Sequence, residues 1–321
     1  MKHLVVVNPK SFMKESAMFS VVRDITAYFK SINDAEYLIY TSRYPRDAIE
    51  VVNEYICGTK DTVRVYSVGG DGILYDCLNG LVGVSNAELA VIPYGTSNDF
   101  VRAFGEGKQE IFRDIAKQAS APSIPTDVIK IGGRYALNFC CVGFEAAVVI
   151  KYYDICKNYP LFLQMFGKHL YMAGIPLALF DKNITRQKYE VLIDGEKYDG
   201  VYLGINIANG PCYGGNKTPF PMAHPADGQM EVMLHNCKIT PYFFVILNNF
   251  IKGKYYKHPK VLQHMHAKEV IIRSNAPIYV NVDGEAYYDS KIEAKIIPAA
   301  VNIAAPDGLP YIRRQNLDIQ R

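Results

Sequence analysis

The chain has 321 residues, of which 49% are hydrophobic and 21% charged, and its formal net charge is +3. Single hydrophobic cores usually stop growing near about 250–300 residues, so the length predicts two domains. The ordinary composition argues against a disordered chain, and the weak positive charge argues against a nucleic-acid-binding protein, which needs a basic surface.

The N-terminal apolar run, MKHLVVVNPK, is too short for a secretory signal and ends in a turn, so it predicts a first strand. Seven cysteines include no Cys-x-x-Cys pair, which favours free thiols in a reducing cytoplasm over disulfides or a zinc cage. Polar residues and a proline interrupt the longest apolar stretch, residues 161–180, so we expect no membrane-spanning helix.

The first 120 residues alternate short β-branched runs with helical periodicity. The predicted strands are residues 3–7, 37–40, 62–68 and 89–92. A helical pattern follows each of the first three, and two short helices follow the fourth. This order predicts a Rossmann-like parallel α/β domain over residues 1–125.

Two prolines in residues 121–125 end the alternation, and we place the domain boundary there. The later chain predicts many strands, with tight hairpins at residues 194–195 and 283–284, because Asp-Gly readily adopts positive φ angles. We expect an antiparallel β-sandwich over residues 126–299, interrupted by helices. The predicted helical segments are residues 144–155, 161–180 and 242–251.

Residues 69–72, Gly-Gly-Asp-Gly, come directly after a buried-type strand and before a helix. Backbone N–H groups at such a helix start can bind phosphate, and Asp71 could reach a magnesium ion. A tight strand-to-helix turn capped by aspartate explains the residues equally well.

A second loop, Pro-Tyr-Gly-Thr-Ser-Asn-Asp-Phe at residues 93–100, follows the next strand. Both loops are expected at the carboxyl edge of one parallel sheet, where open α/β sheets bind ligands. Thr96 offers a hydroxyl, whereas Asn98 and Asp99 could be helix caps. The coincidence of the two loops favours a nucleotide site.

In order and spacing, five segments resemble the diacylglycerol kinase catalytic-domain family, specifically its bacterial soluble lipid kinases. The segments are the Asn-Pro opening at residues 8–9, the loop at 69–72, Gly-Thr-x-Asn-Asp-Phe-x-Arg at 95–102, Gly-Phe-Glu-Ala at 143–146, and the glycine loop at 209–215 with residues 221–231. The resemblance covers nearly the whole chain.

The resemblance implies a NAD kinase/diacylglycerol kinase-like fold that binds ATP between its domains and phosphorylates a lipid hydroxyl, with diacylglycerol preferred. A C-terminal tail, residues 300–321, is expected to pack back on the first domain. The predicted nucleotide-binding residues are Asn8, Pro9, Lys10, Ser11, Phe12, Thr41, Gly69, Gly70, Asp71, Gly72, Ile73, Leu74, Tyr75, Thr96, Asn98 and Asp99.

The resemblance also implies a structural Mg²⁺ held by the carbonyls of His224 and Gln229 and by Asp227. Asp283 and Glu285 match the family's catalytic turn and are the candidates for taking the hydroxyl proton, with Asp71 as a further catalytic residue. Phosphoryl transfer needs positioning and such a base. The sequence does not decide which of the two carboxylates is the base. The alternative to a catalytic turn is an ordinary hairpin at these residues.

The chain departs from the family after its glycine loop. The family continues with Thr or Ser, an apolar residue and Asn-Glu, whereas this chain has Ile73, Leu74, Tyr75 and Asp76. A hydroxyl and an amide are missing, so a catalytically weak nucleotide- or lipid-binding protein is one alternative. A NAD kinase, which shares the Gly-Gly-Asp-Gly loop, is another.

Two further segments bear on partners. His264 and His266 share one face of a predicted strand, but no third ligand is nearby in sequence, so we favour a solvated strand edge over a metal site. Residues 159–180 combine aromatic and aliphatic side chains with neighbouring lysines, and they are the candidate contact with a membrane surface. The sequence does not decide between a monomer and a homodimer.

Overall fold

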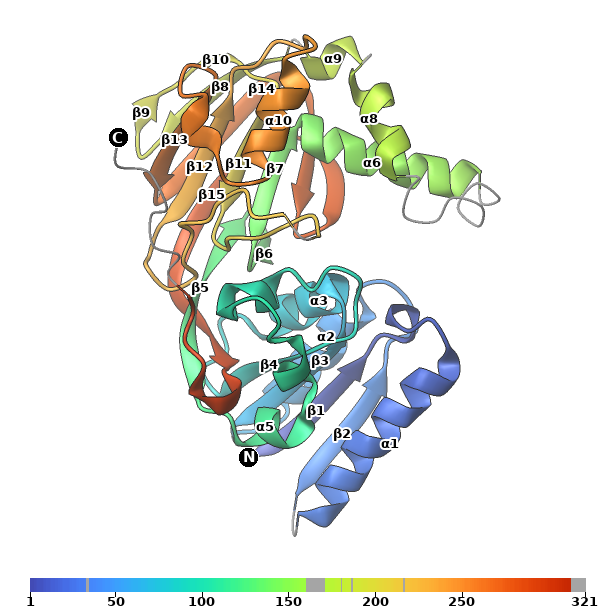
Figure 1. The fold of residues 1–321 in the computed structure, drawn as a ribbon. Helices are drawn as coiled ribbons and strands as arrows, with labels where there is room; N and C mark the ends of the chain where they lie inside the picture. Colours follow the sequence, from blue (N-terminus) through green and yellow to red (C-terminus); the bar gives the residue numbers. More distant parts are fainter. Residues whose placement is uncertain (33–34, 160–170, 180, 186, 216, 313–321) are drawn as a thin grey trace.

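The computed structural model describes residues 1–321 except 33–34, 160–170, 180, 186, 216 and 313–321. Two lobes lie one above the other, and β5 (Ser123–Ile131) and β15 (Glu285–Ala304) run between them (Figure 1). β5 passes through the predicted boundary without a break, and we retain a boundary near residue 125 as a proposal.

The N-terminal lobe is built on a parallel sheet with the order β2-β1-β3-β4. Its strands are β1 (Lys2–Val7), β2 (Glu36–Thr41), β3 (Val63–Gly69) and β4 (Ala87–Pro93). Its helices are α1 (Glu15–Ser31), α2 (Asp47–Cys57), α3 (Asp71–Leu81), α4 (Gln109–Arg113) and α5 (Ile115–Ser120), with 3₁₀ turns η1 (Pro9–Ser11) and η2 (Phe100–Phe104). The predicted parallel α/β lobe is confirmed.

Helices cover both faces of this sheet. Successive residues of β1 alternate between two hydrophobic clusters: Leu4 packs with residues of α2 and α3, and Val5 packs with residues of α1. Every position of β3 is buried, as expected for a central parallel strand. The rigid sheet therefore fixes the positions of the loops that leave its strands.

The C-terminal lobe consists of antiparallel strands in the order β13-β12-β11-β7-β14-β15. Its strands are β6 (Arg134–Ala136), β7 (Phe139–Gly143), β8 (Lys188–Ile193), β9 (Glu196–Lys197), β10 (Gly200–Val201), β11 (Gly204–Ala208), β12 (Met230–His235), β13 (Leu262–Ala267) and β14 (Glu269–Val282), with most of β15. Its helices are α6 (Phe144–Asn158), α8 (Tyr171–Leu179), α9 (Lys182–Thr185) and α10 (Phe243–Phe250), with the 3₁₀ turn η4 (Tyr255–Lys257).

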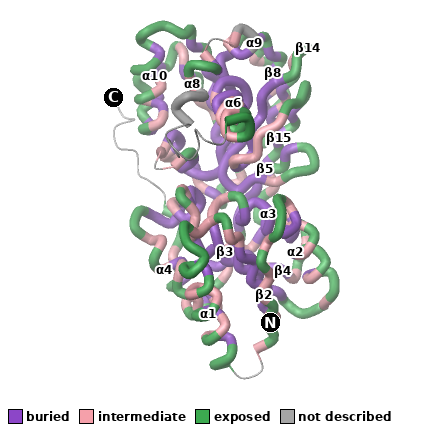
Figure 2. Tube along the Cα trace, turned by 90° about the vertical axis from the view of Figure 1, so that its right-hand side faces the viewer, coloured by how far each residue is buried: buried purple, intermediate pink, exposed green. Residues whose placement is uncertain are grey.

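The main core of this lobe is a buried cluster of strand side chains that includes Ile205, Val232, Ile272 and Ile292. Buried residues are concentrated in the middle of both lobes, and exposed residues lie at their periphery (Figure 2). The expected antiparallel β-rich lobe is confirmed. Among the described residues, no helix has the length and apolar character needed to cross a bilayer.

Both predicted hairpins form. Asp194 and Gly195 connect β8 to β9 with φ angles of 48° and 87°, and Asp283 and Gly284 connect β14 to β15 with 46° and 98°. Positive φ at both central residues is the signature of a tight I′ turn, which suits Asp-Gly. The second hairpin fixes where Glu285 begins β15.

The end of the described chain lies against the N-terminal lobe. Ile303 of β15 pairs in parallel with Leu89 of β4, and η5 (Pro306–Gly308) follows. The Tyr311 ring packs on Phe104 with centroids 4.5 Å apart, and the Ile312 N–H donates to the Ala103 carbonyl at 2.8 Å. Residues 300–312 therefore contact this lobe, and the rest of the predicted tail lies outside the described residues.

Candidate active site

Three loops meet at the carboxyl edge of the parallel sheet, because they leave the neighbouring strands β1, β3 and β4. The Asn8 N–H donates to the Val68 carbonyl at 3.0 Å, and the Gly70 N–H donates to Ser11 Oγ at 3.2 Å. The Tyr94 N–H donates to the Gly69 carbonyl at 2.7 Å. The two predicted phosphate loops and the Asn-Pro segment are thus one assembly.

The two glycine loops touch backbone to backbone. A Cβ added to Gly95 would lie 2.2 Å from the Gly70 Cα, and one added to Gly70 would lie 3.0 Å from the Gly95 Cα. Neither position can carry a side chain without moving the other loop. This contact explains why glycine stands in both loops.

Replacing Gly95 by alanine should therefore push the loops apart and destabilise the protein by about 1–3 kcal/mol, the usual cost of overpacking. Urea unfolding of the purified protein measures this change. Gly72→Ala is the matched control, since a Cβ there meets nothing within 4 Å. Equal stability of Gly95→Ala and the parent protein would contradict the loop contact.

Asp71 ties the two loops together through its carboxylate. Its Oδ2 accepts a hydrogen bond from the Asn98 N–H at 3.0 Å, and its Oδ1 accepts one from the Asp99 N–H at 2.9 Å. The Asn98 side chain closes its own loop by accepting from the Gly95 N–H at 2.9 Å. Asp71 thus reaches the second loop and does not cap its own helix.

Asp99 connects the lobes, because both its carboxylate oxygens accept the Gly215 N–H at 3.2 Å. Gly215 belongs to the glycine loop of the C-terminal lobe and has a φ of 69°. The sequence suggested a helix cap for Asp99, and the structure shows no side-chain cap bond there. The predicted second-half glycine loop is therefore part of the same site.

Three carboxylates gather around these loops: Asp71, Asp99 and Asp283. Burial and the negative charges of Asp99 and Asp283 together raise the pKa of Asp71 to about 7, against the lowering effect of backbone N–H donors. Burial also raises the pKa of Asp99 and, to about 6, that of Asp283. Oxygen ligands with excess negative charge fit a hard divalent cation such as Mg²⁺.

The raised pKa of Asp71 gives a testable pH dependence. Between about pH 4 and 7 the folded protein binds this proton more tightly than the unfolded chain does, so the free energy of unfolding should fall as pH rises through that window. Asp71→Asn removes this titration. The decrease in the free energy of unfolding between about pH 4 and 7 should therefore be smaller in the variant, by up to a few kcal/mol. Urea unfolding at several pH values in EDTA measures it. Parallel curves for the two proteins would contradict the shift.

Asp283 is an anchor within the C-terminal lobe. Its buried carboxylate accepts hydrogen bonds from the N–H groups of Leu137 at 2.6 Å, Asn138 at 3.2 Å and Phe139 at 2.9 Å. Asp194, at the other hairpin, likewise accepts from Lys268 N–H at 3.0 Å, but it is exposed. Both oxygens of Asp283 are therefore engaged in fixing the turn.

Glu285 differs, because its half-exposed carboxylate pairs with a side chain of the other lobe. Arg46 lies just before α2 at a φ of 75° and forms ion pairs with both Glu285 and Asp76 of α3. Its guanidinium carbon lies 4.6 Å from the centroid of the Tyr75 ring. Sequence reasoning missed Arg46, because a lone arginine after Tyr44-Pro45 carries no motif and its partners lie far along the chain.

The same assembly of domains occurs in known proteins. Residues 2–131 match the diacylglycerol kinase catalytic domain, and residues 164–305 match the YegS C-terminal NAD kinase beta sandwich-like domain. The N-terminal lobe is thus similar to the diacylglycerol kinase catalytic domain and the C-terminal lobe to the YegS C-terminal domain, in that order along the chain. The resemblance read from the motifs is confirmed.

Two relatives from Staphylococcus aureus, strains N315 and JH9, carry the name "Putative lipid kinase" and are each 27% identical over 256 residues, 78% of this chain and 79% of theirs. Two solved structures from Bacillus anthracis, one described as a putative diacylglycerol kinase and the other as a diacylglycerol kinase, have TM-scores of 0.71 and 0.68 at 23% and 20% identity. Each covers 96% of this chain and 98% of the solved one, which shows the shared fold.

The departures from the family's glycine loop lie on the buried side of α3. Ile73 and Leu74 are only 2% and 5% exposed and pack in the N-terminal core, while Tyr75 packs with the core of the C-terminal lobe. Any contact of these residues with a nucleotide would thus come from their backbone. By contrast, Thr41 and Thr96 are exposed at the ends of β2 and β4.

The residues that the sequence predicts to hold a structural magnesium ion, His224, Asp227 and Gln229, precede β12. Asp227 Oδ1 accepts from the Gln229 N–H at 3.1 Å, and the Gly228 N–H donates to the Asp127 carboxylate at 2.7 Å. Burial raises the pKa of Asp227. A carboxylate and the carbonyls of His224 and Gln229 are the hard oxygen donors that Mg²⁺ prefers, so the chemistry of the turn fits the ion.

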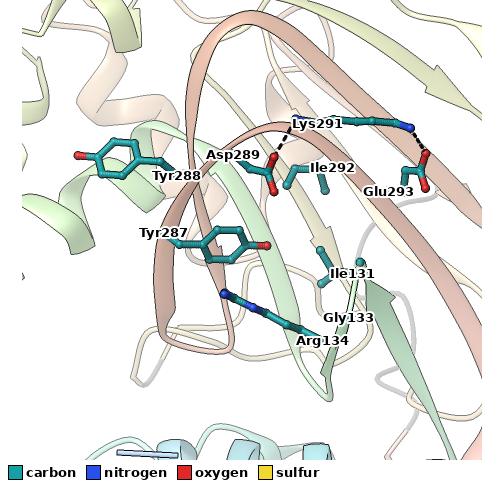
Figure 3. Close-up of a pocket in the computed structure, with 10 residues that line it drawn as sticks. Ile131, Gly133, Arg134, Tyr287, Tyr288, Asp289, Lys291, Ile292 and Glu293 are labelled. Carbon is teal, nitrogen blue, oxygen red and sulfur yellow. Dashed lines mark hydrogen bonds and ion pairs between the residues drawn. The ribbon is translucent and has the colours of Figure 1, made fainter.

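A pocket of about 510 Å³ is lined by residues 131–134, at the β5–β6 turn, and by residues of β15 between 287 and 293 (Figure 3). The Arg134 guanidinium lies over the Tyr287 ring at 3.9 Å. The charges of Arg134 and Lys291 are balanced in the lining by Asp289 and Glu293. The pocket is therefore suited to an uncharged polar group more than to an anion.

Proposed function

We propose that this protein is an ATP-dependent lipid kinase that transfers the γ-phosphate to a lipid hydroxyl, with diacylglycerol as the leading acceptor. The observation that carries the proposal is the assembly of two glycine loops on Asp71, linked through Asp99 to the lobe that holds the hairpin carboxylates. Phosphoryl transfer depends on such positioning and on electrostatic stabilisation.

The nucleotide contacts are proposed at the loops after β1, β3 and β4. Backbone N–H groups at the start of α3 suit phosphate oxygens, because the helix dipole favours negative charge there. Mg²⁺, when bound, would neutralise charge on the phosphates, and Asp71 and Asp99 are the residues we assign to it. The turn at Asp227 would hold a second, structural Mg²⁺ ion.

Glu285 is the carboxylate we assign as the base for the lipid hydroxyl. The Asp283 oxygens already accept three backbone N–H groups, whereas the described structure records no backbone N–H donor to the Glu285 carboxylate, which pairs with Arg46. The ion pair with Arg46 holds the Glu285 carboxylate where the two lobes meet. In this role Arg46 is a positioning residue.

We propose that the protein is cytoplasmic and touches the membrane transiently, at the end of the C-terminal lobe that carries α8 and α10 (Figure 1). Tyr242 and Phe244 are 57% and 53% exposed, and Leu177 is 49% exposed. Exposed Lys238 and Lys252 flank α10, a composition that favours anionic lipid surfaces. Residues 160–170 of the predicted lipid-facing segment lie outside the described residues.

Sedimentation with vesicles that contain phosphatidylglycerol tests this contact. Phe244→Glu should reduce the bound fraction, because it places a negative charge on the apolar face. Phe19→Glu, at an exposed position of the N-terminal lobe, is the control and should bind as the parent protein does. If Phe244→Glu and Phe19→Glu bind the vesicles equally well, α10 is not part of the membrane contact.

A transfer assay tests the function. ATP labelled at the γ-phosphate is offered with diacylglycerol, a sphingoid base, phosphatidylglycerol, a polyprenol or NAD, and we expect labelled phosphatidic acid. Label in NAD alone would favour a NAD kinase. ATP binding with no transfer to any acceptor would favour a catalytically weak binding protein. The Asp71→Ala variant should not show the transfer that the parent protein shows.

A further inference from the structure

Two histidines and one glutamate converge on the C-terminal lobe, away from the loops described above. Glu231 lies on β12 directly opposite His266 of β13, and His264 lies two residues before His266 on the same strand. His266 Nε2 is 3.1 Å from Glu231 Oε1, and His264 Nε2 contacts Glu231 Oε2. The register of the β12–β13 pair thus supplies the third ligand that was not found near the histidines in sequence.

The cluster has the form of a built site. The Glu231 side chain is 5% exposed, and both of its oxygens face imidazole nitrogens. His264 is 21% exposed and packs against the Tyr255 ring with centroids 4.7 Å apart, while His266 is 54% exposed. His266 is thus solvated, as the sequence predicted for this edge, whereas the Tyr255 ring partly covers His264.

We propose that Glu231, His264 and His266 bind a divalent transition-metal ion, and that Zn²⁺ is the ion that these donors suit best. One ligand atom from each residue lies within 4.8 Å of the others. Ligands at about 2.0–2.2 Å from one zinc ion lie about 3–4 Å apart, so small side-chain rotations are enough. Two imidazoles and one carboxylate leave a fourth position for water.

This site differs chemically from the magnesium turn that precedes it. The turn offers carboxylate and carbonyl oxygens, which hard ions prefer, whereas imidazole nitrogens favour zinc and similar ions. β13 ends the sheet path in the described structure, so an ion can reach His266 from solvent. A bound ion would join β13 to β12 through side chains as well as backbone.

Calorimetric titration of the full chain with Zn²⁺, in excess Mg²⁺, tests the proposal. We expect one strong site in the parent protein. Removing an outer-shell partner of a metal ligand typically lowers metal affinity by roughly 10–100-fold. Because His266→Ala removes a direct ligand, it should lower Zn²⁺ affinity by at least that factor. Gln263→Ala, an exposed position on the same strand, should bind as the parent protein does. Cys57→Ser controls for the exposed thiol.

A second measurement separates ligand loss from unfolding. Zn²⁺ should raise the thermal unfolding midpoint of the parent protein and of Gln263→Ala, but not that of His266→Ala, because only a ligand that binds the folded state stabilises it. Co²⁺ in the site should show tetrahedral d–d bands without a thiolate charge-transfer band. Equal Zn²⁺ affinity in His266→Ala, or binding that disappears in Cys57→Ser, would overturn the proposal.

Discussion

Replacing Glu285 by glutamine should lower lipid phosphorylation by about 10²–10⁴-fold, the usual contribution of a general base. Glutamine keeps the size of the side chain but cannot take a proton. Arg46 would keep its ion pair with Asp76, so the fold should be retained. The measurement is kcat/KM for the acceptor that the panel identifies, with unfolding midpoints recorded in parallel.

Glu36→Gln is the matched control for this experiment. Glu36 is exposed at the first position of β2, away from the carboxyl edge of the sheet, and pairs with Lys2. Its removal should change kcat/KM by less than about threefold, as expected for a surface ion pair. Glu285→Gln with parental activity would show that Glu285 is not the base.

Removing the Asp283 carboxylate should have the largest effect on stability, because it leaves the buried N–H groups of residues 137–139 without an acceptor. Unsatisfied buried donors cost about 1–3 kcal/mol each, and relief of the buried charge offsets part of this, so we expect Asp283→Ala to lose about 3 kcal/mol. Alanine also tolerates the φ of 46° less well than aspartate does. Urea unfolding at pH 7.5 measures the loss.

Asp194→Ala is the control, since it removes the same anchor from an exposed hairpin where water can replace the carboxylate. Its loss should be about 1 kcal/mol. Asp283→Asn then distinguishes anchor from base, because it keeps one acceptor and removes the buried charge. We expect Asp283→Asn to fold and to retain much of its activity. A folded but inactive Asp283→Asn would transfer the role of base from Glu285 to Asp283.

Local patterns predicted the fold well in this chain. The alternation of β-branched runs with helical periods predicted four parallel strands, and Asp-Gly predicted both hairpins. These signals are local, since a strand's side-chain period and a turn's φ angles depend on a few neighbouring residues. The two glycine loops were placed at one sheet edge by the same reasoning, because adjacent parallel strands end together.

The roles of particular side chains needed the packed structure. Sequence could not choose between Asp283 and Glu285, because the choice depends on which backbone N–H groups of the segment before β7 reach the turn. It missed Arg46, whose two acidic partners come from α3 and from the other lobe. It gave His264 and His266 no third ligand, because Glu231 is brought to them by strand register. Contacts between distant segments are set by how strands pair and lobes dock, and no local pattern encodes them.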